Sequence, residues 1–201
     1  MRKTMLAILS LSLFICSPVL AHDTEPSSDF AEYSVIAGVS PFGGSLMFGY
    51  NKNEKTSWLV GFGGLPGGNA LEFDIDGTKY DVDSSSAWAG FFINHRPLEN
   101  AMWFRLVAGL GFGSIENELD DGNGNKYRAD YRENPVGYVG VGFGSQAKKG
   151  FLIGFDIGML YTGGPMVRPV AGDGADVEAI EDFWMFDSVL PNGQLTLGYG
   201  F

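Results

Sequence analysis

Apolar residues alternate with polar residues or glycine in several segments of the chain. Successive side chains of a strand point to opposite faces, so a period of two residues predicts β-strands with one apolar face. The final segment, 193–201, follows this pattern. It is clearest in 151–162, where one face would carry Phe151, Ile153, Phe155, Ile157, Met159 and Tyr161.

The alternation predicts eight strands, at residues 32–39, 45–50, 55–64, 79–96, 102–115, 135–145, 151–162 and 193–201. An even number of antiparallel strands puts both chain ends on one side of a membrane. The connections then sort by length, with short periplasmic turns at 51–54, 96–100 and 146–149 and long outer loops at 65–78, 116–134 and 163–192. The sequence therefore predicts an all-β fold, an eight-stranded antiparallel transmembrane β-barrel.

Two stretches need more than the alternation. In the fourth strand either Ala87, Phe91 and Ile93 or Trp88 and Phe92 could face outward. We prefer the first set, because it turns Asn94 inward. Residues 71–75 could extend a hairpin above the membrane.

Composition supports a barrel over other membrane classes. The chain has 30 glycines and 14% aromatic residues, and its mean hydropathy is only +0.03. A helical membrane bundle would be far more apolar, whereas only every second residue of a barrel strand faces lipid. The formal net charge of −11 argues against nucleic acid as a partner.

The start of the chain predicts export. Arg2 and Lys3 precede an apolar run that ends near Ala21, which is typical of a cleaved signal peptide at 1–21. Cleavage would remove Cys16, the one cysteine, so no disulfide is expected. Residues 22–31 are predicted to form a flexible periplasmic N-terminal tail, and 32–201 the outer-membrane β-barrel.

The end of the chain resembles the outer-membrane β-barrel proteins of Gram-negative bacteria, whose final strand ends in Phe. The resemblance implies that the barrel-assembly machinery reads a signal made of Phe201, Tyr199, Leu197 and Leu195. It also implies periplasmic chaperones, outer-membrane lipid and lipopolysaccharide as partners.

The alternative to a membrane barrel is a soluble periplasmic barrel of lipocalin type, which would carry its apolar face inside.

A narrower resemblance covers roughly residues 80–201. The runs 134–138, 142–144, 155–158 and 163–165 are similar to those of a group of uncharacterised proteobacterial outer-membrane proteins. Members of that group also carry an acidic helix before a Phe-terminated strand. The resemblance implies the fold and the location and no activity.

The inside of the barrel is predicted to be filled by side chains, because eight strands enclose little more than their own side chains. Arg105 and Asp156 would point inward from non-adjacent strands and form an ion pair, joined by Asn94. Trp103 is also expected to point inward. The alternative reading of these charges is a proton or ion pathway.

The last outer loop is predicted to contain a short helix, residues 176–186. Val177, Ile180 and Trp184 fall on one face at helical spacing, and Asp176 stands at the N-cap position. We expect the helix to pack over or into the barrel mouth as a lid. A helix lying at the lipid surface is the alternative.

Candidate catalytic and metal-binding residues are few. His95 is placed at the periplasmic end of its strand, far from Ser84, Ser85 and Ser86, so no Ser/His/Asp arrangement is expected. The run 121–125 resembles a calcium loop but lacks the Gly and Glu of an EF-hand, which leaves a loose surface cation site as a weaker option. We expect no enzyme activity, no cofactor and no bound metal.

The function that these features favour is a structural or surface-interaction role. A conduit for a small solute or a hydrophobic ligand is the first alternative. A lipid-modifying outer-membrane enzyme is the second.

Overall fold

The structure, a computed structural model, describes residues 29–201 except 69, 133–134 and 173. The predicted signal peptide and most of the predicted tail lie outside the described residues. Of that tail, Phe30 bridges to Lys148, and Ala31 is buried and accepts a hydrogen bond from the Asn51 side chain (2.8 Å). Within the described part, no helix is long and apolar enough to span a membrane.

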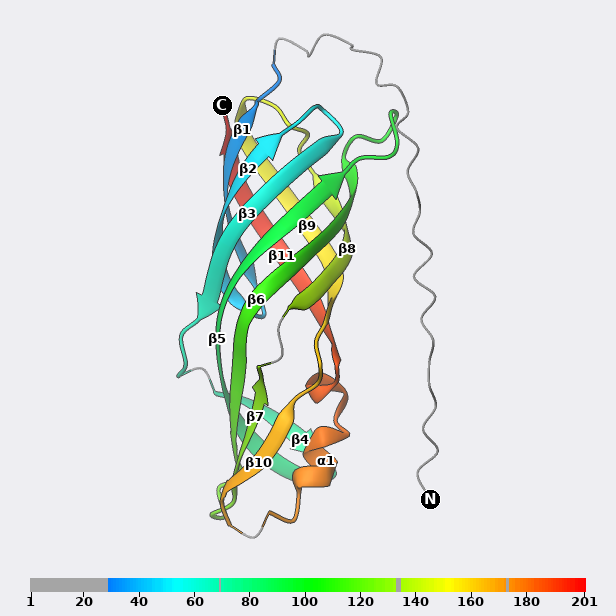
Figure 1. The fold of residues 1–201 in the computed structure, drawn as a ribbon. Coiled ribbons are helices and arrows are strands. Elements are labelled where there is room, and N and C mark those ends of the chain that lie inside the picture. The colour runs from blue at the N-terminus through cyan, green and yellow to red at the C-terminus, as the bar shows by residue number, and fades with distance from the viewer. Residues whose placement is uncertain (1–28, 69, 133–134, 173) are drawn as a thin grey trace.

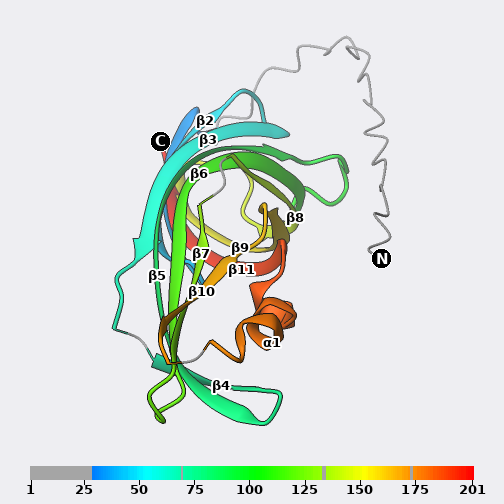
Figure 2. The same ribbon diagram turned by 60° about the horizontal axis from the view of Figure 1, so that its bottom comes forward.

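Eight strands close into an antiparallel ring (Figures 1 and 2). Each strand pairs with its neighbour in the chain order, and the last strand pairs with the first, from Ser34 opposite Gly200 to Val39 opposite Leu195. Closure leaves no free strand edge, which a barrel in hydrocarbon requires. The ring strands are β1 (Tyr33–Ser40), β2 (Gly43–Asn51), β3 (Thr56–Leu65), β5 (Thr78–His95), β6 (Phe104–Asp120), β8 (Val136–Gly144), β9 (Gly150–Tyr161) and β11 (Val189–Gly200).

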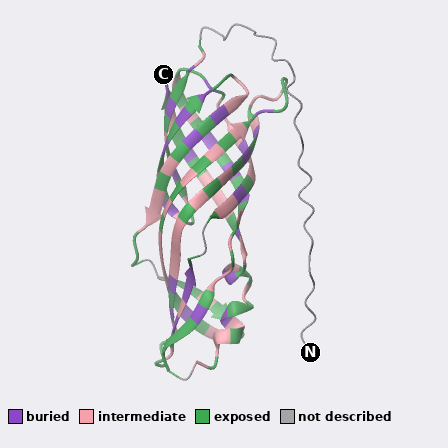
Figure 3. Ribbon diagram, in the orientation of Figure 1, coloured by how far each residue is buried: buried purple, intermediate pink, exposed green. Residues whose placement is uncertain are grey.

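Alternation decides which side chains face outward, and Figure 3 shows it as a chequered pattern of burial around the ring. The predicted phase of β5 is correct: Phe91 and Ile93 are exposed outside, whereas Trp88 and Phe92 line the interior. The outer surface is an apolar belt that includes Phe48, Val60, Leu110, Ile153 and Leu197. This arrangement contradicts the lipocalin alternative, because the apolar face is on the outside.

Trp103 lies on the outside of the barrel, contrary to the prediction. The expected inward position is wrong, because Trp103 precedes β6, is exposed, and stacks on Phe143 with ring centroids 5.8 Å apart. Since the strand begins only at Phe104, the alternation does not apply to Trp103. Its position near the chain's periplasmic turns suits an aromatic residue at a membrane interface.

The long outer segments also differ from the prediction of loops. β5 and β6 continue beyond the ring, where β5 pairs with β4 (Ala70–Ile75) and β6 pairs with β7 (Lys126–Tyr131). β10 (Met166–Ala171) pairs in turn with β7. The result is a five-stranded extracellular sheet in the order β4-β5-β6-β7-β10. The predicted hairpin at 71–75 is present as β4 and β5, and most of the predicted loop at 116–134 is a second hairpin.

The predicted helix is shorter than expected and lies elsewhere. It consists of α1 (Val177–Glu181) and a 3-10 turn, η1 (Trp184–Phe186). Both pack on the inner face of the extracellular sheet, and neither is a lid in the barrel mouth (Figure 1). The sheet offers the helix an apolar surface that the separate sequence segments did not reveal.

Candidate functional site

The inside of the barrel contains a buried ion pair between β6 and β9. Arg105 donates from Nε to Asp156 Oδ1 (3.0 Å) and from Nη2 to Asp156 Oδ2 (2.8 Å). Each residue is only 7% exposed. Two parallel hydrogen bonds in a buried site fix both side chains, as is usual for a bidentate guanidinium–carboxylate pair.

Glycine on the intervening strand makes room for this pair. Gly142 on β8 stands between Arg105 and Asp156 in the strand register. A Cβ at Gly142 would overlap Asp156 Oδ1 and Arg105 Nε, and one at Gly154 would lie 2.7 Å from Arg105 Nη2. The inward glycines are therefore a condition for the pair.

Asn94 was expected to join the pair, but it makes no hydrogen bond to either residue. It is half-buried on β5, where it pairs with Ser57 and Val107. The lumen residue without a predicted role is Arg96, which ends the predicted strand 79–96 and begins the predicted turn 96–100. Arg96 has the inward parity of Asn94, so the alternation of the predicted strand was the available signal.

Arg96 forms the periplasmic floor of the lumen. It is 5% exposed, and its side chain crosses to the neighbouring turns. Nε donates to the carbonyl of Met102 (3.0 Å) and Nη2 to that of Ser145 (2.8 Å). A cationic side chain therefore ties two periplasmic turns together beneath the ion pair.

Aromatic side chains occupy the middle of the lumen. Trp88 meets Phe92 edge to face at 6.2 Å, and Phe92 meets Tyr138 in the same way at 6.0 Å. These contacts fill much of the interior, but a cavity of about 160 Å³ remains, lined from Ser40 near the outer end to Asn51 near the floor. The prediction of a filled lumen therefore holds only in part.

The extracellular sheet has a hydrophobic core of its own. One face of the sheet, together with α1 and η1, buries a continuous cluster that is separate from the lumen. Its fully buried members are Ile75, Tyr80, Val82, Leu119, Tyr127, Ala129, Val167, Ile180 and Phe186. Burial on this scale indicates a defined structure above the membrane.

Two tyrosines fasten the start of the helix to the sheet. Tyr80 donates its hydroxyl to Asp176 Oδ2 (2.7 Å), and Tyr127 donates to the same oxygen (3.2 Å). Burial of the phenol, followed by the hydrogen bond to Asp176 and its negative charge, raises the pKa of Tyr80 well above the ordinary value. The neutral, hydrogen-bond-donating form of Tyr80 is thereby favoured.

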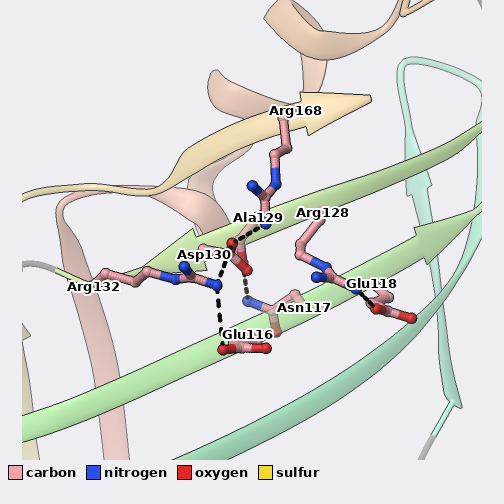
Figure 4. A network of polar contacts seen from close by, with 8 residues as sticks. All are labelled: Glu116, Asn117, Glu118, Arg128, Ala129, Asp130, Arg132 and Arg168. Carbon is pink, nitrogen blue, oxygen red and sulfur yellow. Dashed lines mark hydrogen bonds and ion pairs between the residues drawn. The ribbon is translucent and has the colours of Figure 1, made fainter. Parts of the chain in front are cut away.

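The opposite face of the extracellular sheet is charged. Asp130 is 4% exposed, and its Oδ2 accepts from Arg168 (3.0 Å) and Arg132 (3.1 Å), as Figure 4 shows. Arg128 pairs with Glu118 across the β6–β7 register. Acidic residues dominate on β5 and β6, and basic residues on β7 and β10, so this face carries both signs in separate halves.

The residues of the expected assembly signal lie together on the outer side of the C-terminal strand. Leu195, Leu197 and Tyr199 of β11 are exposed in the apolar belt, and Phe201 follows them. Phe201 exchanges backbone hydrogen bonds with Tyr33 of β1 (2.9 and 3.1 Å), and their rings stack at 6.3 Å. Recognition of these residues by the assembly machinery stays a prediction.

The candidate catalytic residues remain apart. His95 Nδ1 lies 3.0 Å from Thr56 Oγ1 at the periplasmic end of β5, whereas Ser84 and Ser86 lie in the middle of that strand. The run 121–125 forms a tight turn in which Asp121 accepts from the backbone N–H of Asn123 and Asn125 (2.8 and 3.0 Å). Across the described residues, no group of three or more His, Cys, Asp or Glu side chains is placed to hold a metal ion.

Comparison with known proteins supports the fold. The sequence matches no family model and no curated protein. Among solved structures, CarO of Acinetobacter baumannii is similar over 85% of this chain and 98% of its own, with 18% identity and a TM-score of 0.65. A second A. baumannii protein, CarO2, gives 17% identity and a TM-score of 0.67 over 86% of this chain and 99% of its own.

A third similar structure is a major outer membrane protein from Thermus thermophilus. It matches 84% of this chain and 98% of its own, with 14% identity and a TM-score of 0.54. At these identities the likeness concerns the fold. The chain is a small eight-stranded β-barrel of the outer-membrane type, in agreement with its apolar outer belt.

Proposed function

We propose that this outer-membrane barrel serves as an anchor for its extracellular sheet, which contacts lipopolysaccharide at the cell surface. The observation that carries the proposal is the sheet itself, with a buried core on one face and charged side chains on the other. A barrel with only a structural role has no need of such a built surface.

The charged face points the same way as the lipid-facing surface. Outward residues of β5 run from Phe91 in the apolar belt to Asp83 and Asp81 in the sheet, with unchanged alternation. Along a strand, the six steps from Ala87 to Asp81 span about 20 Å, at roughly 3.3 Å per residue. At this height we expect the charged face to lie beside the headgroup layer of the outer leaflet.

The chemistry of the face suits lipopolysaccharide. Exposed Lys126, Arg132 and Arg168 offer N–H donors for phosphate oxygens. The carboxylates on β5 and β6 add oxygen ligands for the divalent cations that accompany anionic lipid. We propose lipopolysaccharide as the first partner on these grounds.

Site-specific photo-crosslinking in intact cells tests this proposal. A photoreactive residue in place of Asp81, on the charged face, is expected to give a lipopolysaccharide adduct. The matched control is Trp184, which is exposed on η1 on the other side of the sheet. Equal adducts at both positions, or none at Asp81, would contradict the proposed contact.

A conduit for a small solute or hydrophobic ligand is the second candidate, and the cavity of about 160 Å³ favours it. The ion pair, Arg96 and the aromatic row stand against it, because their side chains occupy part of the lumen. Proteoliposomes that take up a small solute faster than empty liposomes would favour the conduit. We propose no enzymatic role, since the serines of β5 lie in the middle of the strand and His95 at its periplasmic end, at least nine residues or about 30 Å away.

A further inference from the structure

The floor of the lumen carries unbalanced charge. Among the described residues that line the cavity, the charged side chains are Arg96, Arg105 and Asp156. All three are more than nine-tenths buried. Two guanidinium groups against one carboxylate leave one positive charge without a protein partner of opposite sign.

The strand register indicates that the two guanidinium groups lie close together. β5 pairs with β6 up to His95 opposite Leu106. The same register continued by one residue sets Arg96 opposite Arg105, and both charges of the ion pair act on the Arg96 guanidinium. Like charges directly opposite each other in a sheet are destabilising. Both carboxylate oxygens of Asp156 already accept from Arg105.

The hydrogen bonds of Arg96 neither balance its charge nor use all of its donors. Its Nε and Nη2 donate to the carbonyls of Met102 and Ser145, but Nη1 is buried without a hydrogen-bond partner. A buried cation without a counter-charge is costly, and an unpaired N–H donor adds to the cost. An anion beside Arg96 would remove both penalties.

We propose that the floor of the lumen binds one small monovalent inorganic anion, of the chloride class, beside Arg96. One negative charge balances the site, and a cavity of about 160 Å³ has room for such an ion together with water. Asn94 and Ser57, neighbours in the β3–β5 register, line the same cavity and bring amide and hydroxyl donors to its wall. The site is independent of the charged extracellular face.

The test compares salts at equal ionic strength. The mature protein, folded in detergent, is heated in sodium chloride or in sodium isethionate, whose anion is much larger than chloride, and unfolding is followed by gel mobility. The unfolding temperature is expected to be higher in chloride and to saturate with its concentration. In Arg96→Gln, the loss of a charged donor should raise the chloride concentration for half the effect at least about tenfold.

Arg168→Gln is the matched control, because it removes an arginine outside the lumen and should keep the full chloride effect. Equal unfolding temperatures in the two salts, or an unchanged chloride dependence in Arg96→Gln, would overturn the proposal. Should Arg96→Gln fail to fold, wild-type crystals soaked in bromide decide the matter. Anomalous density beside Arg96 supports the site, and its absence there refutes it.

Discussion

Removing one partner of the lumen ion pair should weaken the barrel more than any surface change. In Asp156→Asn, the Arg105 guanidinium keeps its buried position but loses the carboxylate that accepts both of its hydrogen bonds. Breaking a buried pair in this way typically costs about 3–5 kcal/mol, because an uncompensated charge remains buried. Asp156 is the one carboxylate among the described residues that line the cavity, and the neighbouring Arg96 is a second cation.

Urea unfolding from lipid vesicles measures this loss. With a slope of about 2 kcal/mol per M, the midpoint of Asp156→Asn should fall by roughly 2 M. The double variant Arg105→Met with Asp156→Leu should recover most of the loss, since it removes both charges of the pair and leaves neither without its partner. Lys79→Gln, which breaks an exposed pair with Glu72, serves as the control and should leave the midpoint unchanged. A midpoint for Asp156→Asn equal to that of the wild type would refute the reasoning.

Three further predictions concern assembly, the extracellular core and pH. Deletion of Phe201 should lower outer-membrane yield in cell fractionation, whereas a substitution of inward Thr196 should be mild; equal yields would contradict the signal. Ile180→Ala should destabilise the extracellular cluster by about 2–5 kcal/mol. Hydrogen exchange in β7 should become faster, while the heat-modifiable gel mobility of the barrel stays unchanged. Slowed or unchanged exchange would count against a separate core. Because the pKa of Tyr80 is raised in the folded state, its contribution to stability is complete below about pH 10, the ordinary tyrosine value, and is lost as the pH rises through the raised pKa. An alkaline titration followed by tyrosinate absorbance should show a late step that is smaller in Tyr80→Phe, and an unchanged step would contradict the assignment.

The barrel itself was readable from alternation because the membrane imposes it. Phe151 to Tyr161 must face lipid at every second position, while Gly154, Asp156 and Gly158 face a narrow interior. Lipid on one side and close-packed side chains on the other leave little freedom. The phase of β5, ambiguous from its apolar residues, followed from the need to turn Asn94 inward.

The extracellular sheet was not readable in the same way. In the run 116–120, Leu119 is the only apolar residue, so its strand pattern is hidden by charge. The partners of Leu119 in the buried cluster, such as Val167 and Ile180, come from segments far along the chain. A core that assembles from scattered single residues has no local period, which is why the segments were expected to be loops.

The lumen was predictable only as far as the strand ends. Arg105 and Asp156 were placed by alternation and are close together in the structure. Arg96 lies one residue beyond the end of β5, and its contacts with Met102 and Ser145 depend on how two turns fold. Turn geometry is decided by tertiary packing, and the pattern of the strand does not contain it.

Single-channel recording in planar bilayers tests the account of this barrel most directly. The ion pair, Arg96 and the aromatic row from Trp88 to Tyr138 project into the lumen and narrow it. The account predicts that the purified protein, once inserted, gives no steady conductance above the bare bilayer. A reproducible open level that persists without added ligand would contradict a closed lumen and favour the conduit instead.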